Sequence, residues 1–235
     1  MKNKNSMQMM LASMALMLMA SPAFAQKFKV AKVERTRILI DRKWDAQPDA
    51  EAAKFIAPYQ HKVDSIMGPV VGSVAHDMTH HRPESELSNL LSDILVWGGR
   101  QFNEQPVFSV YNMGGIRADF AKGDINVGDV SEVAPFENKI CFLTLTGEKV
   151  LELFQQIAHR GGEGVSHAVR MVITRDGKLK GVTLNGEPVD PAKSYRIATL
   201  DYLAEGNDQL VAFKSGTDVV APKAKENNVR YIIMD

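Results

Sequence analysis

Residues 140–157 read ICFLTLTGEKVLELFQQI, and the hydrophobic period changes within this stretch. Ile140 to Leu145 form an apolar, β-prone run, which predicts a strand. From Thr146 onward the apolar positions recur every three or four residues, which predicts a helix with an inward face made of Val150, Leu151, Phe154 and Ile157. A strand that passes directly into a helix indicates a domain built from both kinds of element.

The segments on either side repeat this mixture. Apolar spacing and β-prone runs predict helices and strands at 49–66, 83–97, 107–111, 170–174, 179–184 and 195–200. Asp176-Gly177 is a strong signal for a two-residue hairpin turn, and Asn185-Gly186 marks the next turn. We therefore expect the α/β (α+β) class, with a layered mixed sheet and flanking helices.

The N-terminus predicts export. Lys2 and Lys4 precede an uncharged apolar run over 9–20, and Ala23-Phe24-Ala25 supplies small residues at a signal-peptidase site. The alternative is a membrane helix, but a span needs about 20 apolar residues and this run is shorter. We expect a signal peptide at 1–25, an N-terminal extension at 26–48, a domain at 49–235, no membrane span, and a periplasmic or secreted protein.

Charge and cysteine content exclude other classes. The chain has 28 basic and 28 acidic residues, and loss of the leader leaves a net charge of about −2, which argues against a nucleic-acid partner. Cys141 is the only cysteine, so the domain has no internal disulfide. A buried structural thiol is a commoner role for such a residue than nucleophilic catalysis.

Candidates for catalysis are scarce. His76 and His80 are spaced to share one helix face, where they could hold a metal, but an H-E-x-x-H motif is absent. We favour a solvated histidine cluster over a metal site. The chain also has no P-loop, no G-x-G-x-x-G and no G-x-S-x-G motif.

Three predicted loops carry residues suited to binding. Asn112-Met113-Gly114-Gly115-Ile116-Arg117 follows a strand, and its glycines permit close approach to a ligand. Phe136 and Tyr202 lie in two other loops and could clamp a flat ring, with stacking worth about 1–3 kcal/mol per base. Asp208 could accept hydrogen bonds from a ribose. Taken singly, each feature is more typical of packing or turn chemistry.

In order, these segments resemble the C-terminal domain of the 5′-nucleotidase family. The family's N-G-G-G-I-R motif corresponds to Asn112 to Arg117, and its P-F-x-N motif to Pro135 to Asn138. Leu145-Thr146-Gly147 matches the L-T-G element before a helix, and 186–199 is similar to the last strands of the family. The resemblance covers about 70–215.

The resemblance implies a nucleoside site. It places the base between Phe136 and Tyr202, the ribose at Asp208, and the phosphate near Arg117, with Arg82 as a further phosphate-side arginine. It also implies substrate-binding roles for Asn112, Gly114, Gly115 and Asn138. Three departures concern substrate identity: Met113 replaces a glycine, Asn207 replaces another, and Tyr202 stands where phenylalanine is usual.

In that family a separate N-terminal metallophosphoesterase domain holds two metals. Few residues precede the resembling region here, and they lack the family's D-x-H and N-H-[ED] motifs. We therefore expect no cofactor in this chain and divalent metals only in a metallophosphoesterase partner chain. We expect this chain to bind a nucleoside or nucleotide for breakdown and to be inactive alone. A stand-alone nucleotide-binding protein and a scaffold with a decayed pocket remain alternatives.

Overall fold

A computed structural model describes residues 30–39, 42 and 49–235. The chain divides into two units, Met1–Ala50 and Glu51–Asp235, and the sheets all belong to the second. The predicted signal peptide and much of the predicted extension lie outside the described residues. Among the helices that the structure describes, none combines the length and apolarity that crossing a bilayer requires.

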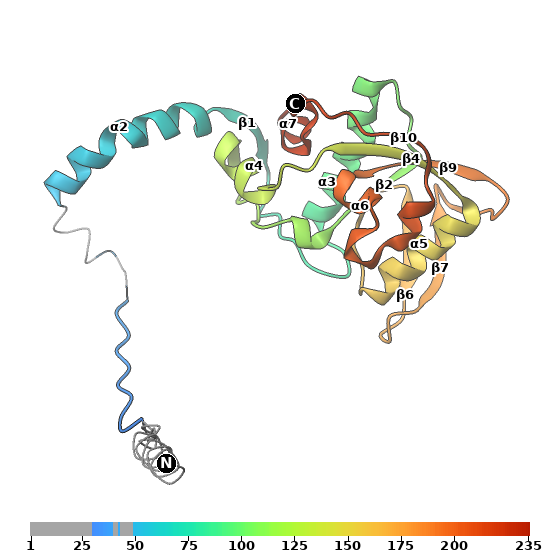
Figure 1. The fold of residues 1–235 in the computed structure, drawn as a ribbon, viewed down its shortest axis with the longest axis horizontal. Coiled ribbons are helices and arrows are strands. Elements are labelled where there is room, and N and C mark those ends of the chain that lie inside the picture. The colour runs from blue at the N-terminus through green and yellow to red at the C-terminus, as the bar shows by residue number, and fades with distance from the viewer. Residues whose placement is uncertain (1–29, 40–41, 43–48) are drawn as a thin grey trace, which may run out of the picture. The chain divides into compact units, whose positions relative to one another are not determined.

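A five-stranded mixed sheet forms the centre of the second unit (Figure 1). Its strands, in spatial order, are β10 (Thr217–Val220), β4 (Ile140–Thr146), β9 (Ser194–Leu200), β2 (Phe108–Tyr111) and β5 (Gly164–Val165). β2 and β9 run parallel, and every other neighbouring pair is antiparallel. The predicted strands at 107–111, 140–145 and 195–200 are therefore confirmed, within one residue at each end.

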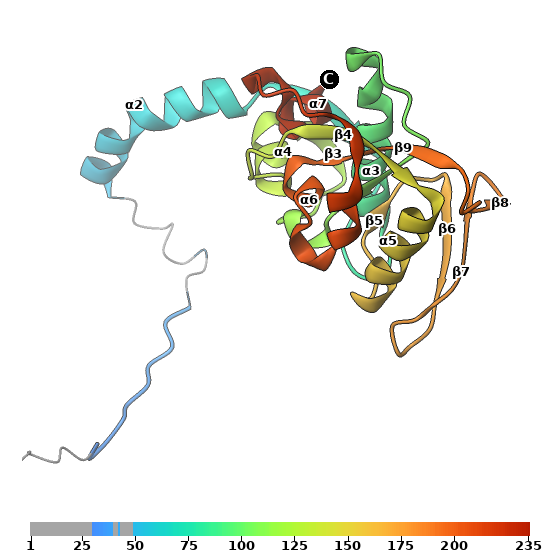
Figure 2. The same cartoon turned by 45° about the vertical axis from the view of Figure 1, so that its right-hand side comes forward.

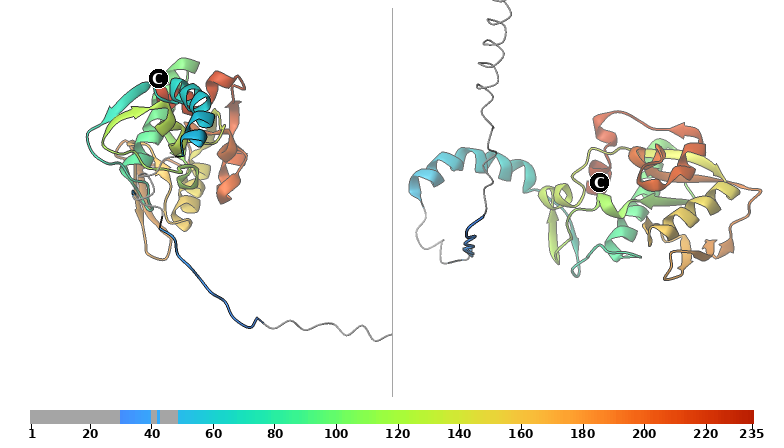
Figure 3. Two further views of the ribbon diagram at one scale, coloured as in Figure 1. Left: turned by 90° about the vertical axis from the view of Figure 1, so that its left-hand side faces the viewer. Right: turned by 60° about the horizontal axis from the view of Figure 1, so that its bottom comes forward.

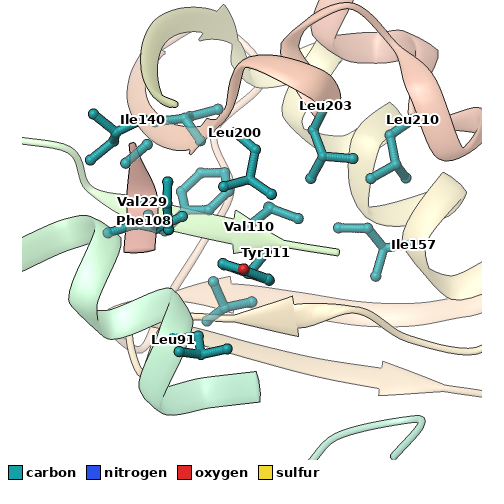
Figure 4. Close-up of a cluster of buried hydrophobic side chains, with 14 of the residues drawn as sticks. Leu91, Phe108, Val110, Tyr111, Ile140, Ile157, Leu200, Leu203, Leu210 and Val229 are labelled. Atoms are coloured by element: carbon teal, nitrogen blue, oxygen red, sulfur yellow. The ribbon is translucent and has the colours of Figure 1, made fainter. Parts of the chain in front are cut away.

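Helices α3 (Glu86–Gly98) and α5 (Gly147–His159) cover opposite faces of this sheet. The Phe108 ring of β2 lies 5.3 Å from the Phe154 ring of α5, whereas the next side chain, Ser109, donates its hydroxyl hydrogen bond to the Ser92 carbonyl of α3 at 2.5 Å. Because successive side chains of a strand point to opposite faces of the sheet, these two contacts place α5 on one face and α3 on the other. Figure 4 shows the core that results, with side chains from α3, β2, α5 and the 200–210 segment.

Both helices begin where capping chemistry places them. The Ser85 hydroxyl accepts from the backbone N–H of Ser88 in a capping box before α3. The Thr146 hydroxyl accepts from the backbone N–H of Lys149 before α5. The helices predicted from Pro83 and from Thr146 are thus confirmed, but the first begins at Glu86, three residues later than predicted, because Ser85 caps it.

The predicted hairpin is also present, but the expected two-residue turn is wrong. The Gly177 N–H donates to the Thr174 carbonyl and the Thr174 N–H donates to the Lys178 carbonyl, both at 2.9 Å, so the loop has three residues, 175–177. β6 (Val169–Ile173) pairs with β7 (Leu179–Leu184), and β8 (Glu187–Pro188) follows in a three-stranded sheet beside α5 (Figures 2 and 3). Gly177 takes a φ of 75°, and Asn185 and Gly186 take 51° and 86°. These left-handed conformations are those that asparagine and glycine adopt with least strain, which is why these residues mark the turns.

Several short elements were not predicted from the sequence. β1 (Val70–Val74) pairs with β3 (Gly123–Asn126), and α4 (Val127–Val133) follows β3 at once. α6 (Asp201–Ala204), the strand β10 and α7 (Val229–Met234) complete the unit. α7 packs against α3, and Ile232 of α7 would meet a side chain at Gly98.

Helix α2 (Ala50–Met67) confirms the helix predicted at 49–66, but its apolar face is not part of the core. None of its residues is buried, and Phe55 remains 72% exposed. Phe55 and Tyr59 contact only each other among aromatic rings, at 5.9 Å between centroids, in the described part of the chain. The helical period of α2 therefore identifies a face that the described domain does not cover.

Candidate functional site

Three segments that are distant in sequence meet around one cavity of about 220 Å³. One segment follows β2, another joins α4 to β4, and the last runs from α6 to a short turn. The cavity is lined by Asn112, Gly114, Phe136, Asn138, Tyr202 and Asp208. All six were candidate binding residues from the sequence. The fold brings their three segments together, which the periodicity of the sequence could not predict.

The glycine segment turns sharply after β2. Met113–Gly115 form a single 3-10 turn, and Asn112 precedes it in extended conformation. A Cβ atom at Gly115 would lie 2.5 Å from Asn112 Oδ1, whereas a Cβ atom at Gly114 would meet no atom within 4 Å. Gly115 therefore makes room for the buried Asn112 side chain, and Gly114 leaves the cavity wall bare.

Asp208 is held from two sides. Its carboxylate accepts a hydrogen bond from Asn112 Nδ2 at 2.9 Å and another from the Tyr202 hydroxyl at 3.2 Å. Asp208 has a φ of 54° and Gln209 a φ of 63°, so two consecutive non-glycine residues adopt left-handed backbone. Such conformations cost about 1–3 kcal/mol each and cluster at functional sites. Partial burial and the Asp208 charge raise the pKa of the Tyr202 phenol.

One carboxylate joins the two segments that carry the aromatic side chains. Phe136 lies in a loop as expected, whereas Tyr202, also expected in a loop, lies in helix α6. Asp201 Oδ1 accepts from the backbone N–H of Tyr202 at 2.8 Å and from that of Lys139 at 3.0 Å. Phe136 is 49% exposed and Tyr202 37% exposed. Large exposed rings beside a cavity, on segments tied to each other, form a surface on which a flat ligand can stack.

The Phe136 loop has a second support from α7. The Arg230 guanidinium donates to the carbonyl of Ala134 at 3.0 Å and to that of Pro135 at 2.6 Å. These bonds satisfy carbonyls at the C-terminal end of α4 and fix the chain just before Phe136. No sequence pattern connects residue 230 with this loop.

The remaining three predicted residues do not line the cavity. Gly115 lies behind Asn112, as described above. Arg117 is exposed, and its guanidinium makes a long contact of 3.4 Å to the Gly114 carbonyl. Arg82 instead donates to Glu163 Oε1 at 2.6 Å and to the Gly162 carbonyl at 3.1 Å.

Sequence reasoning missed Arg160 and Glu163. Arg160 Nη2 lies 3.8 Å from Asp208 Oδ2, and Arg160 Nε donates to Glu163 Oε1 at 2.6 Å. Gly161 and Gly162 separate them with φ values of 81° and 108°. A double glycine after a predicted helix, flanked by opposite charges, was the available signal.

The histidine premise was wrong. Residues 76–80 are not helical, so the spacing of His76 and His80 does not place them on one helix face. His76 pairs with Glu86 at 2.7 Å, and His80 pairs with Asp119 at 2.6 Å. Within the described residues, no group of three or more His, Cys, Asp or Glu side chains is arranged to hold a metal ion.

A larger cavity of about 780 Å³ lies between β6 and the 161–167 segment. It contains none of the nine predicted binding residues. Its walls combine the aliphatic side chains of Ile157, Val169 and Met171 with polar and charged ones, among them Glu84 and Arg170. We favour the smaller cavity because candidate residues from three separate segments line it, whereas size alone does not identify a binding site.

Comparison with known proteins gives a consistent match. A family model described as "5′-nucleotidase, C-terminal domain" matches residues 70–215. Protein UshA of Escherichia coli (strain K12) is 30% identical over 157 residues, which are 66% of this chain and 28% of that protein. Protein UshA of Salmonella pullorum is 36% identical over the same shares of the two chains.

Solved structures agree with the sequence comparison. The crystal structure of a 5′-nucleotidase precursor from Thermus thermophilus matches with a TM-score of 0.67 and 26% identity. The match covers 81% of this chain and 40% of that one. This chain therefore spans well under half the length of the proteins that it resembles.

Proposed function

This chain belongs to the 5′-nucleotidase family through its C-terminal domain, and from that premise we propose that its 220 Å³ cavity binds the nucleoside part of a nucleotide. Phe136 and Tyr202 stack on the two faces of the base, and Asn138 contacts its edge. Asp208 accepts hydrogen bonds from the ribose hydroxyls. The observation that carries the proposal is the meeting of these side chains, from three separate segments, around one cavity.

The polar groups of the cavity suit a neutral sugar. The Asp208 carboxylate already accepts from Asn112 and Tyr202, and an ionised carboxylate has about four acceptor positions. Two positions thus remain for vicinal hydroxyls. Hydrogen bonds to an ionised group contribute about 1.5–3 kcal/mol, so the ribose adds appreciably to stacking on the aromatic pair.

The phosphate contributes little to affinity in the isolated chain under this proposal. Arg82 is committed to Glu163, and Arg117 is exposed to solvent. Exposed ion pairs contribute about 0–1 kcal/mol, so adenosine monophosphate should bind no more than about fivefold more tightly than adenosine. Met113, which stands in place of a glycine, is buried and does not line the cavity.

We assign the phosphoester chemistry to a separate metallophosphoesterase partner chain. A two-metal centre needs several Asp, His and Asn ligands around both cations. The described residues do not fit such a centre, since His76 and His80 pair with different carboxylates, those of Glu86 and Asp119. This chain then holds the substrate for nucleotide breakdown, and its partner supplies the metals. The predicted leader supports export of this chain to the periplasm or outside the cell, so the partner chain must be exported as well.

A calorimetric titration of residues 26–235 with adenosine and with adenosine monophosphate tests the proposal. We expect saturable binding that Phe136→Ala and Tyr202→Ala each weaken by about 1–3 kcal/mol. Tyr231→Ala is the matched control, since Tyr231 is 40% exposed and its side chain does not line the cavity. The absence of saturable heat with the wild-type chain contradicts binding in isolation and favours a scaffold with a decayed pocket.

A further inference from the structure

Glu163 is a fully buried carboxylate that no sequence motif singled out. Its side chain has 0% exposure, and it accepts three short hydrogen bonds. Oε1 receives Arg82 Nη2 and Arg160 Nε, both at 2.6 Å, and Oε2 receives the backbone N–H of Met113 at 2.6 Å. We call Arg82, Met113, Arg160 and Glu163 the Glu163 cluster.

The burial of this charge requires the whole cluster. An ionised carboxylate removed from water is costly unless it is paired and hydrogen-bonded, and here two guanidinium groups and an amide satisfy it. Arg82 and Arg160 are themselves partly buried, with side-chain exposures of 31% and 17%. Removal of the carboxylate would leave two neighbouring cations without their shared partner, so the three side chains form one unit.

One arm of the cluster fixes the glycine segment. Met113 is the first residue of the 3-10 turn, where a backbone N–H has no partner within the turn. Glu163 supplies that partner. Because Asn112 precedes Met113, the same bond sets the position from which Asn112 Nδ2 reaches Asp208.

The other arm directs Arg160 toward the candidate site. Arg160 caps the C-terminal end of α5, and its guanidinium spans from Glu163 Oε1 to within 3.8 Å of Asp208 Oδ2. Asp208 thus faces a cation and an amide that both depend on Glu163. Glu163 itself does not line the 220 Å³ cavity.

We propose that Glu163 is a positioning residue of the nucleoside site, a role that rests on the proposed function. It holds the backbone of Asn112 and Met113 and the guanidinium of Arg160, and through them it fixes the Asp208 carboxylate at the ribose. The cluster is a determinant of affinity for the sugar and contributes nothing directly to base stacking.

The first readout needs no ligand. We expect the amide proton of Met113 to resonate far downfield in the nuclear magnetic resonance spectrum, because its bond to a carboxylate is short and charge-assisted. Glu163→Gln should move this signal and the Asn112 side-chain amide signals upfield. Glu104→Gln is the matched control, since Glu104 forms a partly buried, two-bond ion pair with Arg196 elsewhere in the fold.

The second readout is the affinity for adenosine by calorimetry. Glu163→Gln should weaken binding by about tenfold, whereas Glu104→Gln should leave it unchanged. If Glu163→Gln does not fold, Arg160→Lys replaces it, because Glu163 then keeps Arg82 and Met113 as partners. Arg160→Lys should weaken adenosine binding while the Met113 amide signal stays in place.

The outcomes separate the two proposals. Glu163→Gln with unchanged Met113 and Asn112 signals overturns the positioning role, whatever the ligand does. A folded Glu163→Gln, or failing that Arg160→Lys, that binds adenosine as tightly as the wild type also overturns it. In a third outcome, the signals shift in Glu163→Gln but the wild-type chain does not bind adenosine. That outcome supports the positioning of Asp208 by the Glu163 cluster and contradicts the proposed function.

Discussion

Gly114 and Gly115 are adjacent in the chain but differ in what a side chain would meet. At Gly115 a Cβ atom would lie 2.5 Å from Asn112 Oδ1, and at Gly114 it would meet nothing within 4 Å. Gly115→Ala should therefore lower the free energy of unfolding by about 1–3 kcal/mol, as overpacking does. Gly114→Ala should change it by less than about 0.5 kcal/mol. Urea unfolding of both variants measures the difference, and equal losses would contradict the packing argument.

Cys141 gives the chain a dependence on alkaline pH. Burial, helped by the Asp201 carboxylate, raises the pKa of the thiol to about 11. Between about pH 9 and 11 the unfolded chain releases this proton while the folded chain retains it, so stability is full below pH 9 and falls as pH rises. Cys141→Ala should lack this component.

The measurement for Cys141 is the difference in unfolding free energy between wild type and Cys141→Ala, taken from about pH 8 to about pH 10.5. Burial also raises the pKa of Tyr111, but that residue is present in both proteins and cancels in the difference. We expect the difference to decrease steadily with pH. A difference that stays constant would show that the folded thiol ionises as readily as the unfolded one.

Individual site residues were only partly predictable. The resemblance to the family identified the six residues that line the cavity, because its motifs retain their order and spacing. Arg160 and Glu163 were missed, since their roles depend on contacts with residues about 50 and 80 positions away. Arg82 was predicted from its position in the family's motif order. Its orientation, however, depends on its contact with Glu163, and a motif comparison does not reveal that contact.

Among the elements, those stabilised by local signals were the ones predicted. α5 has a capping threonine and a continuous apolar face, and the β6–β7 hairpin has a glycine turn between its strands. β1 and β3 lack such signals, because each is short and pairs with a partner about 50 residues away. α4 has only seven residues, although Asn126 and Asp129 form a capping box that could have revealed it.

Helix α2 differs from these elements, because its apolar residues recur at helical spacing but none of its residues is buried. An isolated helix of this length is marginal in water, and Pro58 removes one of its hydrogen bonds. We therefore expect the amide protons of α2 to exchange with solvent far faster than those of α5, whose inner face is buried. Hydrogen exchange measured at several dilute protein concentrations tests this. Strong protection of α2 in the monomeric chain would contradict the exposure described here.

For the molecule as a whole, the question is how recognition relates to chemistry. The 157 residues that match protein UshA from Escherichia coli cover 28% of that protein, and a cavity in this chain is lined by two aromatic side chains and a few polar ones. Phe136 and Tyr202 are half exposed, and a cavity open on this scale can accept a ligand that also contacts another chain. Binding of the base by one chain and attack at the phosphate by another are therefore compatible in space under the proposed division of labour.

This division predicts that residues 26–235 release no phosphate from adenosine monophosphate with added Mg²⁺, Mn²⁺ or Zn²⁺. Addition of an exported metallophosphoesterase chain from the same cell should produce release, because metals and substrate site are then both present. Phe136→Ala should lower that release, and Tyr231→Ala should not. Steady release by the lone chain, kept in a His76→Ala/His80→Ala variant and lost in Arg117→Ala, would instead place the chemistry in this domain.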